Sequence, residues 1–447
     1  MPSDVLTIGF VPIARTTFDI PLAEGMTDQV RAALTGAGMT LVGGETLVTD
    51  LDAIEDTILH LAAEPLDALL VFQASFADST MIMRLVEALA APLIMWAVPE
   101  ERTGGRLRLN SFCGVNLAAH GLARAGYTYD TIVALPDDAA ALEQVQTVAR
   151  AGRVCRRLAE ARIGRVGDHP AGFDTCRVNP SALKSIFGLD VVTIALDTVF
   201  DGARAAEQQA VATVVDQLSD QIDGLADVDQ PALQGTVGAY LTLRHLAEDK
   251  QLDGFAVRCW PEFFTNLGCA ACGSSSMLNN ELIPASCEAD VNGTITQLIL
   301  QWISGEPAFG SDVVAFDTAE DLVVFWHCGK APLAMADPTV RPRATIHSNR
   351  QLPLLMEFPL KPGRVTVARL SEATGEYRLV IGSADVIQAP ISFTGTSGVL
   401  RFDRPADDVQ DIILSEGLEH HLALTYGNHL SSLIALAKML NLPILHL

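Results

Sequence analysis

Apolar and polar positions along the first 100 residues switch between two periods. Short apolar runs indicate buried strands, and the stretches between them repeat apolar residues every three or four positions, as amphipathic helices do. The expected strands are 5–11, 40–42, 68–72 and 92–97, and the expected helices are 23–37, 51–63 and 80–90. This alternation of strand and helix predicts a parallel sheet covered by helices.

A second alternation of the same kind follows a long helical stretch at 139–161. Strands are expected near Ile163 and Val191, and a helix is expected at 205–222. The pattern therefore predicts a second open α/β domain with a Rossmann-like, parallel sheet.

The pattern changes after residue 312, where short strand-like segments are separated by turn residues. These strands are expected at 364–370, 376–381 and 391–393, and a last helix is expected at 430–440. Such segments predict an antiparallel sheet or barrel.

The chain has 447 residues, which is more than one hydrophobic core usually supports. We therefore expect two open α/β domains, 1–150 and 151–305, followed by a β-barrel-like C-terminal domain, 306–447. Hydrophobic residues make up 49% of the chain, enough for cores of this size.

Charge and cysteine content exclude several classes of protein. The net charge of −24 and the sequence pI near 4.7 argue against nonspecific binding to nucleic acid or to an anionic membrane. The eight cysteines are scattered, and the pair Cys269 and Cys272 has no second such pair to complete a zinc ribbon. No apolar stretch reaches transmembrane length, and Ser3 and Asp4 are unlike the start of a secretory signal. We expect a cytoplasmic location.

Two acidic residues 24 positions apart are the first candidates for chemistry. Glu288 precedes a predicted helix, whose apolar stripe contains Val291, Ile295, Leu298, Ile299 and Trp302. Asp312 begins a predicted hairpin. Two carboxylates from neighbouring elements can hold one divalent cation, although a carboxylate at a helix start is also favoured by the helix dipole alone.

Histidines lie in comparable positions. His327 ends the second strand of that hairpin, and the pair His420 and His421 opens a short strand near the C-terminus. Carboxylates with one or two imidazoles suit manganese or magnesium better than copper or structural zinc. A histidine in such a place can equally be structural, so these residues alone leave the question open.

Seven motifs, in order, resemble the L-fucose isomerase and L-arabinose isomerase superfamily, and specifically its shorter fucose-isomerase-like members. The motifs are WAVPE (96–100), LRLNSFCG (107–114), RIGRVG (162–167), CEADVNG (287–293), FWHCG (325–329), FPLKPGRVT (358–366) and HHLALTYGN (420–428). The resemblance covers nearly the whole chain. It implies a metal held by Glu288, Asp312 and His421, with His327 as a further ligand and His420 near the sugar.

The resemblance also implies the cofactor and the assembly. The metal would be Mn²⁺, with Mg²⁺ or Co²⁺ as alternatives, and the chain would form a homo-oligomer with its active site near a subunit interface.

Gly36 and Gly38 are spaced like the start of a dinucleotide fingerprint, but Leu41 replaces the third glycine. They also end a helix instead of opening one, so no nucleotide cofactor is expected.

Sugar recognition requires neutral donors and acceptors and an aromatic face. The candidates are Trp96, Asn110, Arg258, Trp260 and Asn349, with Gln73, Glu262, His347 and Arg350 as further ones. Each has an ordinary structural alternative. The positive charges of Arg258, Arg350 and Lys330 leave open a substrate with an acidic group.

The function implied by the resemblance is isomerisation of an aldose to its ketose, on a pentose or 6-deoxyhexose-type sugar, through a cis-enediolate with a bound metal. Glu288 and Asp312 would act as the acid and base as well as ligands. Epimerisation or retro-aldol cleavage of an unusual or acidic sugar is the first alternative, and a non-catalytic sugar-binding protein is the second. A buried metal cage argues against the second, because a protein that only binds sugar has no need of one.

Overall fold

The structure is a computed structural model that describes residues 5–447, so Ser3 and Asp4 lie outside the described residues. Contacts divide the chain into two compact units. The first contains the residues up to Arg157 together with Ser431–Asn441, and the second contains Leu158–Leu430 and Leu442–Leu447. None of the described helices combines the length and the apolar character that a membrane crossing requires.

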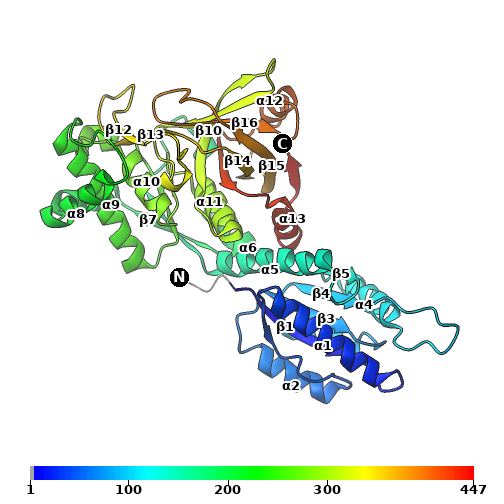
Figure 1. Ribbon diagram of the computed structural model, residues 1–447. Helices are drawn as coiled ribbons and strands as arrows, with labels where there is room; N and C mark the ends of the chain where they lie inside the picture. Colours follow the sequence, from blue (N-terminus) through cyan, green and yellow to red (C-terminus); the bar gives the residue numbers. More distant parts are fainter. Residues whose placement is uncertain (1–4) are drawn as a thin grey trace. The chain divides into compact units, whose positions relative to one another are not determined.

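The first unit is built on a five-stranded parallel sheet with strand order β2-β1-β3-β4-β5. The strands are β1 (Thr7–Ile13), β2 (Thr40–Val42), β3 (Ala68–Gln73), β4 (Leu93–Ala97) and β5 (Tyr129–Val133). The helices are α1 (Ile20–Gly36), α2 (Leu51–Leu61), α3 (Thr80–Ala88), α4 (Ser111–Ala125) and α5 (Ala139–Glu160). The predicted strand and helix alternation is confirmed (Figure 1).

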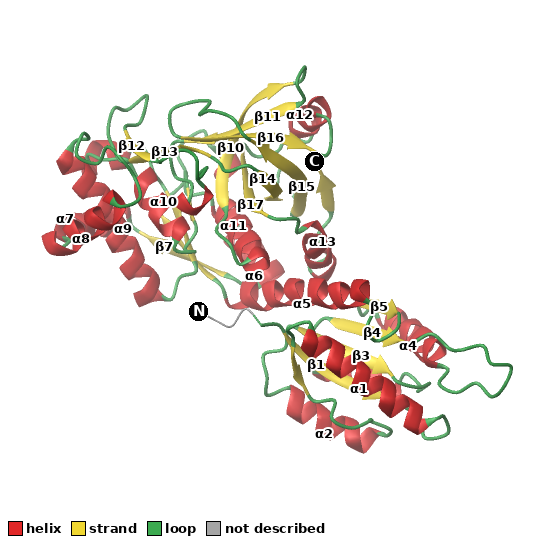
Figure 2. Ribbon diagram, viewed as in Figure 1, coloured by secondary structure: helices red, strands yellow, loops and turns green. Residues whose placement is uncertain are grey.

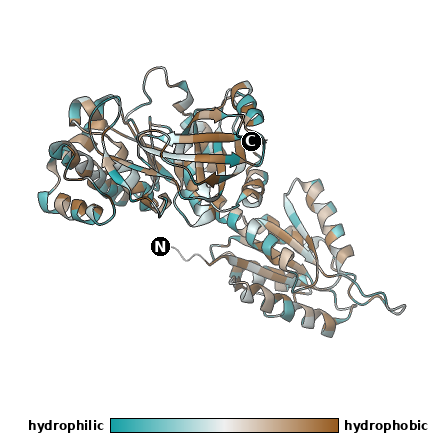
Figure 3. Ribbon diagram, turned by 45° about the horizontal axis from the view of Figure 1, so that its top comes forward, coloured by the Kyte–Doolittle hydropathy of each residue, from teal (hydrophilic) through white to brown (hydrophobic). Residues whose placement is uncertain are grey.

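Two separate apolar clusters show that helices cover both faces of this sheet. One cluster joins buried residues of α1 and α5 to the sheet, and the other joins α2, α3 and α4 to it. The central strand β3 is buried along its whole length, as expected for a parallel sheet covered on both faces. In Figure 3 the helices that cover this sheet carry both hydrophilic and hydrophobic residues, as amphipathic helices do. The C-terminal helix α13 (Leu430–Met439) also contributes to this unit, where Lys438 pairs with Asp130.

The second unit begins with a four-stranded parallel sheet, ordered β7-β6-β8-β9. The strands are β6 (Arg162–Val166), β7 (Asp190–Ile194), β8 (Gly254–Val257) and β9 (Ala285–Ser286). Its helices include α6 (Pro180–Phe187), α7 (Leu196–Ala205), α8 (Gln208–Ser219), α9 (Gln230–Lys250) and α10 (Cys272–Asn280). The second α/β sheet is therefore confirmed.

The helix expected at 205–222 is too long at both ends, because α8 covers only Gln208–Ser219, and α7 before it was not expected. Ala206 and Glu207 have extended backbone angles, which separate α7 from α8. Both helices pack against α9. The break allows each short helix to bury its own apolar residues, Val199 and Phe200 in α7 and Val211 in α8.

The C-terminal part contains a nine-stranded, mainly antiparallel sheet, ordered β12-β13-β16-β11-β10-β17-β14-β15-β18. The strands are β10 (Phe309–Asp317), β11 (Leu322–His327), β12 (Arg343–Thr345), β13 (Leu355–Pro359), β14 (Gly363–Ser371), β15 (Arg378–Ile387), β16 (Thr396–Phe402), β17 (His421–Tyr426) and β18 (Ile444–His446). Strand β15 pairs with β16 as well, so six of the strands form the barrel-like arrangement that the sequence predicted. A short helix, α12 (Ala406–Ser415), follows β16.

The strand expected at 391–393 is wrong. This segment is irregular, and the Phe393 side chain is exposed to solvent. Ser392 N donates to Ser397 Oγ at 2.9 Å, and Gly395 has a φ of +119°. The chain therefore turns here, and the strand begins only at Thr396.

The helix α11 (Val291–Ser304) contacts β8 of the parallel sheet. It also contacts β14 and β17 of the antiparallel sheet, which are labelled beside it in Figure 2. Nearly every residue in it is buried, including polar ones. Two of those polar groups bond to other elements: Thr294 donates to Phe255 O at 2.7 Å, and Gln297 accepts from Gly310 N at 3.1 Å. Because α11 is fixed from both sides, the loop that precedes it has a defined position.

A buried acid in the first unit gives a test of its stability. Asp67 is 1% exposed and pairs with Arg153 at 2.7 Å and Arg156 at 2.6 Å, while Thr7 N donates to it at 2.9 Å. Removing one partner of a buried pair costs about 3–5 kcal/mol. We expect Asp67→Ala to lower the opening free energy of β1 and β3 by about 3 kcal/mol, measured by hydrogen exchange.

The control is Glu55→Ala, which removes an exposed partner of Arg84 in the same unit. Exposed pairs contribute little to stability, so this variant should leave amide exchange in β1 and β3 unchanged. Equal exchange in both variants would contradict a structural role for Asp67.

Candidate active site

Glu288 lies on the loop between β9 and α11, and its backbone has an unusual conformation. Both Glu288 and Ala289 have positive φ angles, 59° and 57°, in the left-handed region that non-glycine residues rarely adopt. Ala289 N donates to Val257 O at 3.0 Å, which ties the turn to the end of β8. Such strained residues cluster at functional sites. Here the turn separates the Glu288 carboxylate from the start of α11.

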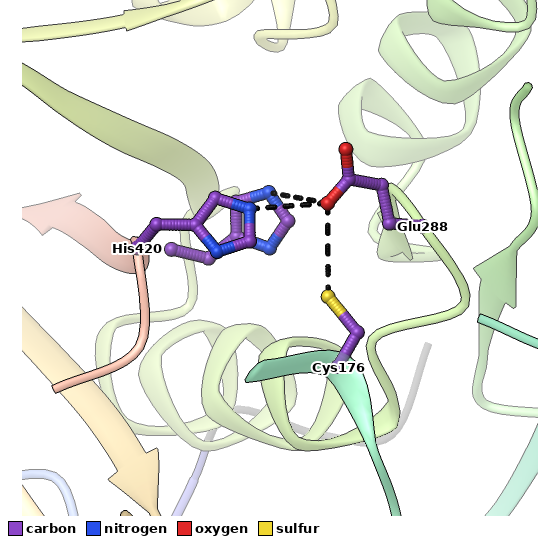
Figure 4. A group of neighbouring side chains, drawn as sticks. Cys176, Glu288 and His420 are labelled. Atoms are coloured by element: carbon purple, nitrogen blue, oxygen red, sulfur yellow. Dashed lines mark hydrogen bonds and ion pairs between the residues drawn. The ribbon is translucent and has the colours of Figure 1, made fainter. Parts of the chain in front are cut away.

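Four side chains surround the Glu288 carboxylate. His420 Nε2 lies 3.0 Å from Oε2, and Trp260 Nε1 donates to Oε1 at 3.3 Å. Cys176 Sγ lies 3.7 Å from Oε2, and His421 Nε2 lies 3.9 Å from it. Figure 4 shows Cys176, Glu288 and His420 pointing toward one another. The side chain of Glu288 is only 13% exposed, so these groups form most of its surroundings.

Strand pairing places Asp312 beside His421. The two residues are direct partners across β10 and β17, and Asp312 Oδ1 lies 3.3 Å from His421 Nε2. His327, at the end of β11, offers a third ligand atom, and the three atoms all lie within 4.8 Å of one another. The sequence placed Asp312 at the start of its strand, but it is the fourth residue of β10. The predicted acidic and histidine ligands are thus brought together.

A buried ion pair orients His421. Its Nδ1 lies 2.9 Å from Asp290 Oδ2, and Asp290 also accepts from Arg369 Nη1 at 2.6 Å and Nη2 at 3.1 Å. Asp290 Oδ1 accepts from Gly293 N at 2.8 Å, which caps α11. Glu419 lies 3.7 Å from the far side of the Arg369 guanidinium. Asp290 can only accept hydrogen bonds, so His421 donates from Nδ1 and presents the Nε2 lone pair to Glu288 and Asp312.

The ionisation of these groups fits that arrangement. Burial would raise the pKa of Asp290, but the charge of Arg369 and the hydrogen bond from His421 hold it well below its ordinary value. Burial lowers the pKa of His421 and outweighs the carboxylates that favour its charged form. Burial would also raise the pKa of Glu288, yet the hydrogen bond with His420 and the charge of His421 lower it. At neutral pH the site therefore contains ionised carboxylates facing a neutral imidazole.

This set of donor atoms fits a divalent cation. The Nε2 lone pair of His421 faces carboxylate oxygens of Glu288 and Asp312, so none of the three atoms supplies a proton to the others. Asp312 Oδ1 is buried without any hydrogen bond, which is costly for a polar atom unless something else satisfies it. A cation among these atoms would attract the three lone pairs and would also satisfy Asp312 Oδ1. Oxygen and imidazole ligands together suit Mn²⁺.

His420 occupies a different position from its neighbour. Its Nδ1 lies 2.9 Å from Thr175 Oγ1, its side chain is 36% exposed, and the ring of Phe173 packs edge-on against it at 6.0 Å. Burial would lower the pKa of His420, but the hydrogen bond with Glu288 and the charge of Asp312 raise it above its ordinary value. A more exposed, protonatable imidazole next to the ligands suits the predicted contact with the sugar.

Three of the predicted substrate residues lie in the second unit. Trp260 is half-buried and contacts Glu288 directly. Arg258 is paired with Glu262 at 2.7 Å, so its charge is already balanced. Asn349 is exposed on the loop before β13. Their substrate roles stay predictions.

Trp96 and Asn110 belong to the first unit. Trp96 is fully buried in its core and donates from Nε1 to Ala134 O at 3.0 Å. Asn110 precedes α4 with a φ of 55°, and its backbone N donates to Glu100 Oε2 at 2.8 Å. These contacts explain both residues structurally, and their role toward a sugar also stays a prediction.

Sequence reasoning missed the residues behind the ligands, chiefly Asp290, Arg369, Thr175 and Cys176. Two signals were present. Arg369 is a lone charge between the apolar residues Ala368 and Leu370 of β14, and Asp290 precedes α11 as a helix cap would. Their pairing across 79 positions has no local signature. Thr175 and Cys176 lie in a single 3₁₀ turn, Asp174–Cys176, which is part of none of the seven motifs.

Comparisons with known proteins match both ends of the chain. The family described as "Fucose/sulfoquinovose isomerase, N-terminal domain" matches residues 9–162. The family described as "L-fucose isomerase, C-terminal domain" matches residues 326–446, which include His327, His420 and His421.

Relatives match over nearly their full length. A protein named sulfoquinovose isomerase from Priestia aryabhattai is 32% identical over 437 residues, covering 98% of both chains. Another of that name from Alkalicoccus urumqiensis is 30% identical over 444 residues, covering 99% of this chain and all of the relative. A third, from Clostridium sp. (strain MSTE9), is 28% identical over 441 residues, covering 97% and 98%. The chain therefore belongs to the fucose/sulfoquinovose isomerase family and is a sugar aldose–ketose isomerase, as the seven motifs predicted.

Proposed function

We propose that this isomerase depends on a divalent metal and converts a 6-sulfonated aldose of the sulfoquinovose type into its ketose. The observation that carries the metal proposal is the convergence of Glu288, Asp312 and the His421 Nε2 lone pair without a proton among them. The substrate proposal is supported by the names of the full-length relatives. The motifs led us to expect a neutral pentose or 6-deoxyhexose. The proposed substrate is instead an acidic sugar, an alternative that the basic residues had left open.

The reaction moves a carbonyl group from C1 to C2. A proton leaves C2, a proton is added to C1, and the hydroxyl proton of O2 is exchanged for one on O1, so the substrate and product are isomers. A divalent cation held by Glu288, Asp312 and His421 would stabilise the negative charge that develops on O1 and O2. His327 is placed to complete this ligand set. We propose Mn²⁺, because the set mixes carboxylates with imidazoles.

The residues of the chain supply the proton transfers. Glu288 is ionised and only partly exposed, so it can accept the carbon-bound proton. Asp312 approaches from a different element and can act on the other side of the same two carbons. His420 is placed to hydrogen-bond a sugar hydroxyl. The family resemblance further suggests a homo-oligomer in which Trp96 and Asn110 of a neighbouring subunit contact the substrate.

Metal removal tests the proposed function directly. Enzyme treated with EDTA and freed of the chelator should lose its conversion of 6-deoxy-6-sulfoglucose to the ketose, and added Mn²⁺ should restore it. Ketose formation is followed by NMR, with untreated enzyme as the control. Full activity in protein shown by elemental analysis to be free of metal would contradict metal dependence.

A substitution at Glu288 tests its role as base. Glu288→Gln keeps the size of the side chain and removes its basicity, so kcat should fall by 100-fold or more, about the contribution of a general base. The matched control is Glu306→Gln, an exposed residue after α11, which should retain full activity. Substantial turnover by Glu288→Gln with a native circular dichroism spectrum would exclude the role.

Asp290→Asn tests the orientation of His421. The amide can still cap α11 through its oxygen, but its nitrogen cannot accept from His421 Nδ1. Loss of such a partner behind a ligating histidine typically weakens metal binding by about 10–100-fold. We expect that loss for Mn²⁺ by calorimetric titration, with Asp317→Asn, at the exposed end of β10, as control. Unchanged affinity in a folded variant would show that Asp290 does not orient the ligand.

A further inference from the structure

Arg350 differs from the other arginines close to the site. Arg258 is paired with Glu262, and Arg369 is paired with Asp290 and Glu419. Arg350 is half-buried, and within residues 5–447 no carboxylate lies within 4 Å of its guanidinium. A partly buried positive charge without a counterion is unfavourable. Its charge is therefore available to something outside the chain.

Aromatic rings hold this guanidinium. Its central carbon lies 4.7 Å from the centre of the Trp260 ring and 5.0 Å from that of Phe264. Cation–π contacts of this kind favour the charged group without neutralising it. The backbone is fixed as well, since Arg350 N donates to His347 O at 3.2 Å and Gln351 N donates to the same oxygen at 2.7 Å.

The same tryptophan connects Arg350 to the candidate active site. The indole donates from Nε1 to Glu288 Oε1, and its face carries Arg350. Phe173 packs edge-on against the indole at 5.2 Å. One indole ring therefore lies between Glu288 and the guanidinium, with contacts of 3.3 Å on one side and 4.7 Å on the other. A hexose with O1 and O2 at the ligand cluster can therefore direct its C6 group toward Arg350.

We propose that Arg350, positioned by Trp260 and Phe264, binds an anionic group at C6 of the substrate, and that a sulfonate is this group. This inference rests on the proposed function and names the residue that makes it selective. A guanidinium presents two parallel N–H donors that match the oxygens of a tetrahedral oxyanion. A local positive charge is needed here, because the protein as a whole carries a charge of −24 and repels anions at long range.

The experiment compares two sugars that differ only in the sulfonate, 6-deoxy-6-sulfoglucose and 6-deoxyglucose, with Mn²⁺-loaded enzyme. Arg350→Met keeps an apolar chain on the rings and removes the charge, and Arg350→Lys keeps the charge without the paired donors. The control is Arg401→Met on β16, an exposed residue whose side chain contacts Glu320 O at 3.4 Å. Glucose 6-phosphate serves as a third sugar, to separate a sulfonate from a phosphate.

We expect Arg350→Met to lower kcat/KM for the sulfonated sugar by about 10–100-fold, the usual effect of losing a hydrogen bond to a charged group. The change should lie mainly in KM, and kcat/KM for 6-deoxyglucose should stay within about twofold. For the sulfonated sugar, kcat/KM of Arg350→Lys should lie between those of the unmodified enzyme and Arg350→Met. Arg401→Met should match the unmodified enzyme. The same order should appear in calorimetric affinities for the sulfonated sugar in a Glu288→Gln background, where turnover is expected to be at least 100-fold slower.

The outcomes separate this inference from the proposed function. If the unmodified enzyme fails to convert the sulfonated sugar, the proposed substrate is wrong. If it converts that sugar and Arg350→Met does so equally well, or loses both sugars equally, Arg350 is not the anion receptor. If the unmodified enzyme prefers glucose 6-phosphate, the receptor is for a phosphate and the sulfonate assignment is overturned.

Discussion

The buried contact between Asp290 and Arg369 is the constraint on which the site depends. The side chains of both residues are 1% exposed, and neither charge could remain in the interior alone. Asp290 uses its remaining hydrogen-bonding capacity to cap α11 and to fix the ring of His421. One carboxylate thus joins a helix of the α/β layer to strands β14 and β17 of the antiparallel sheet. The ligand geometry follows from the same contact that holds these layers together.

The ligands themselves come from separate elements, and each element is fixed for its own structural reason. Glu288 is carried by a left-handed turn in front of a helix that is buried on both sides. Asp312 and His421 face each other because β10 and β17 are paired in register. His327 ends the neighbouring strand. Each proposed ligand is held by packed elements, so little reorganisation would be needed for a cation to bind.

Local patterns were sufficient to predict most of the architecture. The strands of the first unit are short apolar runs between amphipathic helices, which is the strongest signal that a sequence carries. The start of α8 was placed too early, because neither glycine nor proline marks the extended residues Ala206 and Glu207. The apolar residues around Phe393 predicted a strand. The local sequence does not show that the Phe393 side chain faces solvent, so the prediction was wrong.

The candidate site could be predicted where a residue lies in a motif or at an informative spacing from one. Glu288, His327 and His421 lie in motifs, and Asp312 was found from its position 24 residues after Glu288. Asp290 lies in a motif too, but its role was missed along with that of Arg369, because the pair is formed by tertiary packing. The unpaired state of Arg350 is also invisible in sequence, since it depends on which acidic residues lie nearby in space.

The composition of the first unit has a consequence for biosynthesis. Its sheet is made from the first third of the chain, but Ser431–Asn441 also belongs to it, with Met439 packed against its core and Lys438 bound to Asp130. Domains usually fold in order as they leave the ribosome. Here the residues up to Arg157 are separated from Ser431–Asn441 by most of the second unit, so the apolar surface that this segment covers stays exposed until Leu158–Leu430 has been translated.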